Sequence, residues 1–153
     1  MRKLSWLIYL LLLACFSRYL SACSAGSCID ETEARIKATF YSDSTGKALA
    51  PDSVNLFGIN MDTLYNKVTK LKTAEFPLYA ADTTCTFIIR INGISDTLKF
   101  IYSNYTYLIS KECGYTFFFS LDTTIHSFNT IDTITIEKKT ITTFNEENMR
   151  IFY

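Results

Sequence analysis

Glycine, proline, histidine and tryptophan are all scarce in this chain of 153 residues, which has five Gly, two Pro, one His and one Trp. A single histidine, His126, leaves little material for a hydrolase, which needs a nucleophile, a base and an orienting group. The sequence also contains no P-loop, no G-x-S-x-G and no G-x-G-x-x-G motif. His126 lies in Thr-Ile-His-Ser, which we predict to be a solvated loop. We therefore expect a protein that is not an enzyme and takes no cofactor.

Patterns for metal and nucleic acid are missing as well. No C-x-x-C pair accompanies the lone histidine and there is no D-x-D-x-D-G loop, so the sequence predicts neither a zinc site nor a calcium loop. Residues 1–22 hold three basic residues and no acid, which leaves 12 basic and 15 acidic residues in the remainder, a net charge of −3. This balance argues against nucleic acid as a partner. Residues 145–148, Asn-Glu-Glu-Asn, hold two adjacent acids, which we predict to form a turn rather than an acid/base pair.

The amino terminus has the pattern of a lipoprotein signal peptide. Met-Arg-Lys precedes an apolar run over residues 4–16, which is shorter than the roughly 20 residues that span a bilayer. Residues 20–23, Leu-Ser-Ala-Cys, then form a lipobox: an apolar residue, two small ones, and the cysteine whose thiol is acylated. We predict a helical signal peptide over 1–22, lipidation of Cys23, a tether over 23–33 and a single domain over 34–153.

Two alternatives at this terminus stay open. Arg18 lies between the apolar run and the lipobox, where charge is unusual, and residues 12–15, Leu-Leu-Ala-Cys, form a second, poorer lipobox that ends at Cys15. A plain secretory signal cut near Ala22 or Ala25 would instead leave a soluble protein. We favour Cys23 because Ser-Ala directly precedes it, whereas a bulky Leu occupies the equivalent place before Cys15.

The rest of the chain predicts an all-β protein. It is rich in strand-forming residues, with 20 Thr, 12 Phe and 10 Tyr in the full sequence. Apolar residues alternate with polar ones in about eight segments separated by turn residues, and Asn92-Gly93 is a hairpin signal. We predict an antiparallel β-sandwich of immunoglobulin-like type, with a small barrel as the alternative. The predicted strands are 35–41, 52–60, 84–92, 98–102, 105–109, 115–121, 133–137 and 149–153, with an irregular or edge strand over 61–81.

Three consecutive phenylalanines pose a question about layering. In the predicted strand 115–121 we expect Tyr115, Phe117, Phe119 and Leu121 on the inner face and Phe118 on the opposite one. Either both faces of this strand are covered, or an apolar patch is exposed. We favour cover on both faces.

Five cysteines are present, of which Cys15 leaves with the signal peptide and Cys23 takes the lipid. The other three, Cys28, Cys85 and Cys113, would reach an oxidising compartment, where disulfides persist. One disulfide and one odd thiol follow from this count. Cys28–Cys113 would pin the tether to the core, and Cys85–Cys113 is the competing pair.

Seven of the eight aspartates are followed by Ser or Thr and then, in each case, by Val, Leu, Ile or Thr. One explanation is structural, since Asp favours turns and Thr favours the strand that follows. The other rests on a likeness: the triplet resembles the O-glycosylation acceptor motif of exported proteins in Bacteroides-type bacteria. On that hypothesis Thr63, Thr97 and Thr123 are the expected carriers.

The chain as a whole resembles a family of small Bacteroides-type lipoproteins with a domain of unknown function. The resemblance covers residues 23–153 and depends on Cys23, on Cys28, on Glu112-Cys113-Gly114 before an aromatic strand, and on residues 145–148 before the short terminal strand. It implies an envelope lipoprotein, favours Cys28–Cys113 as the disulfide, and leaves Cys85 as the odd thiol. It supplies no catalytic residues.

Two functions are compatible with these expectations. The first is a lipid-anchored, non-enzymatic module of the outer membrane, facing the periplasm or the cell surface, that supports another envelope component such as an outer-membrane protein. Phe117-Phe118-Phe119 would supply its contact surface. The second is a ligand-binding lipoprotein, for example for a glycan, that uses Tyr41, Tyr105 or Tyr107 as stacking platforms.

Overall fold

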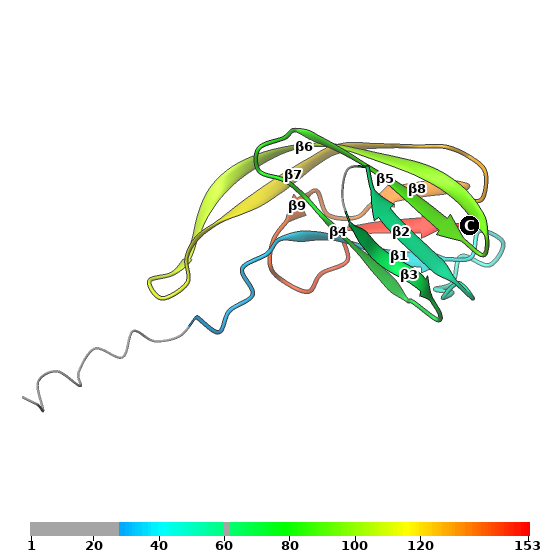
Figure 1. The fold of residues 1–153 in the computed structure, drawn as a ribbon, viewed down its shortest axis with the longest axis horizontal. Coiled ribbons are helices and arrows are strands. Elements are labelled where there is room, and N and C mark those ends of the chain that lie inside the picture. Colours follow the sequence, from blue (N-terminus) through cyan, green and yellow to red (C-terminus); the bar gives the residue numbers. More distant parts are fainter. Residues whose placement is uncertain (1–27, 60–61) are drawn as a thin grey trace, which may run out of the picture.

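The computed structural model describes residues 28–59 and 62–153, and its only regular secondary structure is β-strand (Figure 1). The predicted signal peptide, Cys15 and Cys23 lie outside the described residues. Among the described residues, no helix is long and apolar enough to cross a membrane. The strands are β1 (Arg35–Tyr41), β2 (Val54–Gly58), β3 (Thr63–Val68), β4 (Thr73–Pro77), β5 (Thr84–Ile91), β6 (Ile94–Ser110), β7 (Gly114–His126), β8 (Thr133–Ile136), β9 (Thr140–Ile141) and β10 (Met149–Phe152).

The strands form two sheets that pack face to face. One has four strands in the order β4-β1-β10-β8, and the other has six in the order β3-β2-β5-β6-β7-β9. Every pair is antiparallel except β1 and β10, which run parallel at the centre of the four-stranded sheet. The six-stranded sheet is curled like half a barrel, and β6 and β7 arch over the rest of the molecule (Figure 1). The predicted all-β sandwich is confirmed, with one parallel pair added.

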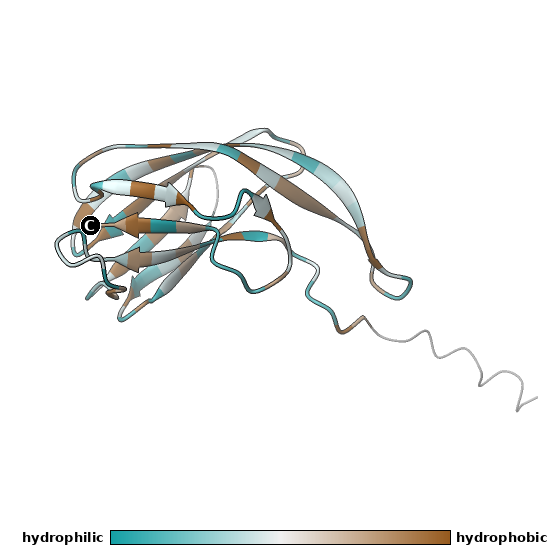
Figure 2. Ribbon diagram, turned by 180° about the vertical axis from the view of Figure 1, so that it is seen from behind, coloured by the Kyte–Doolittle hydropathy of each residue, from teal (hydrophilic) through white to brown (hydrophobic). Residues whose placement is uncertain are grey.

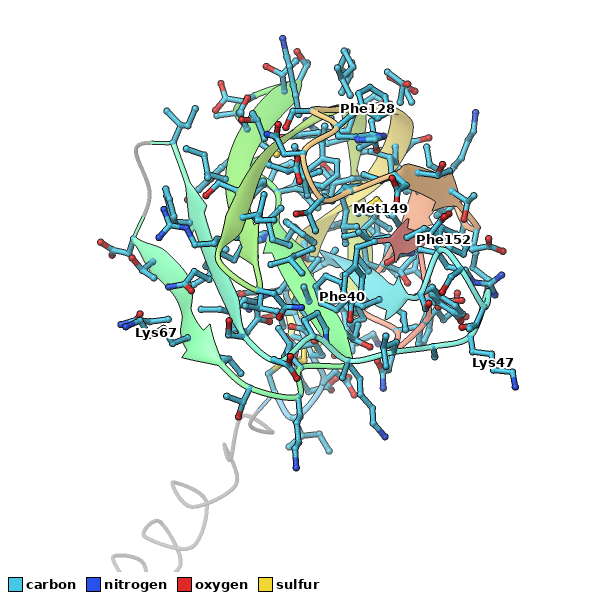
Figure 3. All side chains as sticks on the ribbon, turned by 90° about the vertical axis from the view of Figure 1, so that its right-hand side faces the viewer. Phe40, Lys47, Lys67, Phe128, Met149 and Phe152 are labelled. Atoms are coloured by element: carbon cyan, nitrogen blue, oxygen red, sulfur yellow. A yellow bond between two sulfur atoms is a disulfide. The ribbon has the colours of Figure 1, made fainter. Side chains whose placement is uncertain are left out.

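The core lies between the sheets and follows from the period-2 alternation of the strands. In β1 and β5 every second residue is buried, so one face of each strand packs inward. The centre is aromatic, because the rings of Phe76, Phe87 and Phe100 pack against one another at centroid distances of 5.2 to 5.8 Å. Phe40 and Met149 point into this interior, whereas lysines on the loops and edge strands point outward (Figure 3).

The number of strands differs from the prediction for a local reason. The described part of the chain has ten strands instead of about eight. Two of them lie within residues 61–81, and β9, with only two residues, is too short to show an alternating pattern in the sequence. The expectation of an edge strand is confirmed twice: β3 borders the six-stranded sheet and β4 borders the four-stranded one. Conversely, the alternating segments 98–102 and 105–109 belong to one continuous strand, β6.

The β5–β6 hairpin has the turn that its sequence predicts. Ile91 pairs with Ile94, so the turn contains only Asn92 and Gly93. Both have positive φ, 49° and 93° respectively, as the twist of a two-residue hairpin requires. This turn fixes the register of β6, which then runs for 17 residues.

A buried carboxylate holds the loop between β7 and β8. Asp96 is only 2% exposed, and its two oxygens accept hydrogen bonds from Ser127 Oγ and from the backbone N–H groups of Asn129, Thr130 and Ile131, at 2.6 to 3.1 Å. Burial raises the pKa of Asp96, but these four bonds favour the ionised form and hold the pKa below its ordinary value. Asp96 therefore acts as an internal cap for the 127–131 loop.

Candidate functional site

The paired strands β6 and β7 extend past the sandwich as a projecting hairpin. We call residues 105–118, the outer half of this pair, the arm. Its base is fastened to the segment before β5, because Tyr102 Oη donates to Tyr79 O at 3.0 Å and Asn104 Nδ2 donates to Ala80 O at 2.9 Å. Beyond this base the alternation of burial stops, and all four residues from 105 to 108 are exposed. The arm therefore shows both of its faces to solvent along part of its length.

One face of the arm carries a stacked aromatic cluster. The ring of Tyr107 lies on the ring of Phe118, with centroids 4.3 Å apart and planes 14° apart, and Tyr105 meets Phe118 edge-on at 6.1 Å. Phe118 is buried beneath these two tyrosines, although each of them stays about half exposed. Cover over Phe118 is thus confirmed, but neighbouring tyrosines provide it rather than a further sheet.

The opposite face of the arm corrects the expected inner face. Phe119 is buried and packs edge-on against Tyr102 at 5.5 Å. Phe117 and Tyr115, one and two steps further out on the same face, are 44% and 74% exposed, so their predicted places in the core are wrong. The reason is that residues 105–118 extend beyond the second layer. Hydrophobic residues continue along the arm toward its tip (Figure 2).

A disulfide ties the tip of the arm to the tether. Cys113, in the turn between β6 and β7, is bonded to Cys28, with Cα atoms 4.7 Å apart and a sequence separation of 85. Nearer the base of the arm, Thr116 Oγ1 donates to the carbonyl of Thr32. The pairing implied by the family resemblance is therefore the one present, and the tether runs beside β7 from the arm's tip toward β1.

Two hollows lie on either side of this tether. The first has a volume of about 420 Å³ and is lined by residues that include Ala34, Leu78 and Phe117. The second, of about 380 Å³, lies over the stacked cluster and includes Tyr107, Phe118, Phe144 and the acidic Asp30. Both are open, apolar in part, and bordered by the arm.

The competing cysteine lies inside the protein. Cys85, in β5, is unpaired and buried. Burial raises the pKa of its thiol to about 12, although a hydrogen bond with Tyr102 acts in the opposite direction. The competing Cys85–Cys113 pair is wrong, and Cys85 is the odd thiol of the described chain.

Tyr41 does not join the tyrosines of the arm. It lies in β1, where its ring packs against Phe152 at 5.4 Å and the guanidinium of Arg150 lies 5.1 Å from the ring centroid. Its hydroxyl donates to Glu147 Oε1 at 3.2 Å. Arg150 in turn donates to Glu147 Oε2 at 2.9 Å. Burial raises the pKa of Glu147, but its hydrogen bonds, first among them the bond from Arg150, hold the pKa below the ordinary value.

In the part of the chain that the structure describes, His126 and Glu146 form no catalytic arrangement. His126 is the last residue of β7 rather than a loop residue; its ring packs on Phe128 at 4.4 Å, and its Nδ1 lies 2.8 Å from Ser127 O. Glu146 pairs with Lys138 at 2.6 Å. In the described part of the chain, no three His, Cys, Asp or Glu side chains are grouped as a metal site.

The three predicted glycosylation residues are all exposed, in two kinds of position. Thr63 is the first residue of β3, at a strand end as the prediction places it. Thr97 and Thr123 instead lie inside β6 and β7, where they pair with Ile88 and Ile101. Of the seven Asp-Ser/Thr triplets, five lie in a turn or just before a strand, so the structural explanation accounts for most of them.

Sequence reasoning missed the projecting arm and the Asp96 cap. For Asp96 a signal exists: it shares the inward positions of β6 with Leu98 and Phe100, and an acid at such a position needs a buried partner. For the arm the signal is weaker. Three tyrosines lie close together at positions 102, 105 and 107, and tyrosine suits a surface that is half apolar and half wet.

These features define the protein as a small β-sandwich with a disulfide-tethered aromatic arm. The chain belongs to a family of unknown function (DUF6452), whose model matches residues 53–153. The match includes the whole arm and begins after β1. No curated protein and no solved structure matches this chain.

Proposed function

We propose that this protein is a lipid-anchored, non-enzymatic interaction module of the cell envelope, acylated on Cys23. The observation that carries the proposal is the Cys28–Cys113 disulfide, which joins the lipobox end of the chain to the tip of the arm. Cys23 and Cys28 are five positions apart in the sequence, so fully extended chain spans at most about 18 Å between them. The arm is therefore the part of the domain that the anchor holds nearest the membrane.

The stacked cluster on the arm is the surface that we assign to a protein partner. Its two tyrosines are half exposed and held rigidly by Phe118. Rigid, partly exposed aromatic residues are enriched at protein interfaces and at their energetic centres. The adjoining hollow with Phe144 would accept an apolar side chain of the partner. An outer-membrane protein is the partner class that the proposed location favours.

The anchor is tested by replacing each candidate cysteine in the full chain. Cys23→Ala should move the protein from the membrane fraction to the soluble envelope fraction and abolish incorporation of a labelled fatty acid. Cys15→Ala is the matched control and should change neither property. Retention of Cys23→Ala in the membrane, with label still incorporated, would contradict the assignment of Cys23.

The partner is tested by photo-crosslinking in intact cells. A photoreactive residue at Tyr107 should give a discrete crosslinked product with one envelope protein. The same residue at Lys67, an exposed position on the edge strand β3, is the control and should give none. Identical product patterns at the two positions would contradict a specific contact surface on the arm.

A second candidate function rests on the same tyrosines. Tyr105 and Tyr107 are two residues apart on one strand, on the same face, and half exposed. Sugar rings stack on such aromatic faces, so the arm would bind a glycan as an extended platform. Retention on a glycan array that is lost in the Tyr105→Ala and Tyr107→Ala variants supports this function, and absence of binding by the wild type contradicts it.

We also propose that Thr63, Thr97 and Thr123 carry O-linked glycans. Their side chains are exposed, and a glycan there would solubilise the outer face of the sheet. The intact mass of the mature protein tests this hypothesis. A mass that polypeptide and lipid account for in full contradicts it.

A further inference from the structure

We propose that the tip of the arm docks onto the lipid surface that holds the anchor, with Ile29, Leu108, Tyr115 and Phe117 as its contact residues. This inference rests on the proposed acylation of Cys23. It goes further because it assigns a bilayer as the partner of one face of the arm, whereas the stacked cluster on the other face remains for a protein or a glycan.

The first support is the concentration of exposed apolar side chains near the disulfide. Of the thirteen large hydrophobic residues that are exposed in the described chain, Leu108, Tyr115 and Phe117 lie on this face of the arm. Ile29, next to Cys28 and thus at the tip, is a fourth, with 91% exposure. Soluble surfaces rarely gather such residues without a partner.

The second support is the length of chain between the lipid and the tip. Because Cys28 is bonded to Cys113, the tether cannot carry the tip farther from the acylated cysteine than five residues of chain allow, which is about 18 Å when extended. Shorter paths bring the tip closer to the headgroup region. An acyl anchor therefore raises the local concentration of lipid at this surface before any other contact forms.

The third support is the kind of residue exposed. Tyrosine is enriched at the membrane–water interface, where its apolar ring and its polar hydroxyl are both satisfied, and phenylalanine and leucine occur on the apolar faces of interfacial segments. Lys111 at the tip is outnumbered by Glu112, Asp30 and Glu31, all exposed. Docking must then be driven by apolar burial rather than by attraction to anionic lipid, so it should occur on zwitterionic membranes and should not strengthen with added negative charge.

The test uses tryptophan as a depth reporter, because the only native Trp, Trp6, precedes the predicted cleavage site. Tyr115→Trp and Phe117→Trp place the reporter on the docking face. Phe128→Trp is the control, since Phe128 is 76% exposed and follows the far end of β7, about 40 Å along the strand from Tyr115. Each lipidated full-length variant is reconstituted into phosphatidylcholine vesicles with and without brominated lipid.

We expect bromine to quench the two arm variants about twofold or more relative to the Phe128→Trp variant, because interfacial apolar groups sit roughly 5–10 Å into the headgroup boundary. Replacing about a third of the lipid with phosphatidylglycerol should leave this difference unchanged or reduce it. Equal quenching in all three variants overturns the docking, as does quenching that appears only with phosphatidylglycerol. Circular dichroism shows whether each variant is folded. If one of the two arm variants misfolds, quenching of the other still tests the docking.

Failure of the anchor and failure of the docking give different results. If the protein does not float with the vesicles, the proposed acylation fails and the docking fails with it. If it floats but the arm variants are quenched no more than the control, the anchor stands and only the docking is overturned.

Discussion

The inner and outer halves of the β6–β7 hairpin share one hydrogen-bonded ladder but have opposite relations to the core. In the inner half, Leu98, Phe100 and Tyr102 are buried and alternate with exposed or half-buried residues. In the outer half, the same strand exposes residues 105–108 on both faces. The pairing of β6 with β7 continues from Leu98–His126 to Ser110–Gly114. Backbone pairing alone therefore does not decide what is buried; the second layer does.

This contrast separates the two tasks of the hairpin. The inner half forms part of the aromatic core, where Phe100 packs against Phe76 of the opposite sheet. The outer half is held by its base, its stacked aromatic cluster and the Cys28–Cys113 bond. A strand pair that is covered by no second sheet is only marginally stable by itself. The disulfide and the stacking supply what the missing layer does not.

The largest expected effect comes from truncating one phenylalanine in each half. Phe100→Ala removes a fully buried ring and should lower the free energy of unfolding by about 3–5 kcal/mol. Phe117→Ala removes a ring that is 44% exposed and should cost less than about 1 kcal/mol. Urea unfolding of the two variants beside the wild type measures both values. Equal losses would mean that the arm packs in solution as tightly as the inner half.

Removing the disulfide should act on both halves, but differently. The double variant Cys28→Ala/Cys113→Ala opens a closed loop of 85 residues and should lower the free energy of unfolding by about 2–4 kcal/mol through the unfolded chain. Hydrogen exchange should also show local opening of the arm amides, while inner-half amides still exchange by global unfolding. Cys85→Ala is the control that removes a thiol without a bond. If arm and inner amides lose protection equally, the hairpin unfolds as one unit.

The inner half also makes stability depend on pH. Because the pKa of Asp96 is lower in the folded state than its unfolded value near 3.9, the carboxylate stabilises the fold above that value, and this stabilisation is lost as pH falls through the folded pKa. Asp96→Asn should cost about 1–3 kcal/mol at neutral pH and make the acid-dependent loss shallower. Thermal unfolding from pH 7 to pH 3 measures this. Asp122→Asn, at an exposed Asp-Thr site in the same sheet, is the control, and an equally shallow acid profile for it would contradict the role of Asp96.

The strands were predictable because their signals are local. Alternation in residues 35–41 and 84–92 identified β1 and β5, and Asn92-Gly93 identified the turn between β5 and β6. The extent of the second layer is not local. The exposure of Phe117 and the burial of Phe118 depend on where the four-stranded sheet ends and on which tyrosines lie beside Phe118, and neither is written into the alternation of β7.

The same distinction applies to the candidate site. Cys28 and Cys113 could be named from the sequence, although spacing left Cys85 as a competing partner. Tyr105 and Tyr107 could be named as exposed rings, whereas Tyr41 could not be separated from them before its contacts with Phe152 and Arg150 were known. Surface grouping depends on the packing of distant segments, and a single sequence does not specify it.

The smallest expected change in the free energy of unfolding comes from glycine substitutions in the two turns, one at the end of each half of the hairpin. Gly93, in the turn where the inner half begins, and Gly114, beside the tip of the arm, both have positive φ, 93° and 73°, with no atom within 4 Å of an added Cβ. Alanine at either position is therefore strained by its backbone conformation alone, by about 1 kcal/mol. In Gly93→Ala the strain cannot relax without disturbing the core register, so the full cost should appear in global unfolding.

In Gly114→Ala the strain can relax by local opening of the arm, so the loss in global stability should stay below about 0.5 kcal/mol while amides near the tip exchange faster. Urea unfolding and hydrogen exchange on the two variants distinguish these outcomes. Both substitutions add one methyl group at a place where no atom lies within 4 Å of it. They differ only in whether the second sheet covers the adjoining strands. A larger global loss for Gly114→Ala than for Gly93→Ala would show that the arm is coupled to the core more tightly than its exposure indicates.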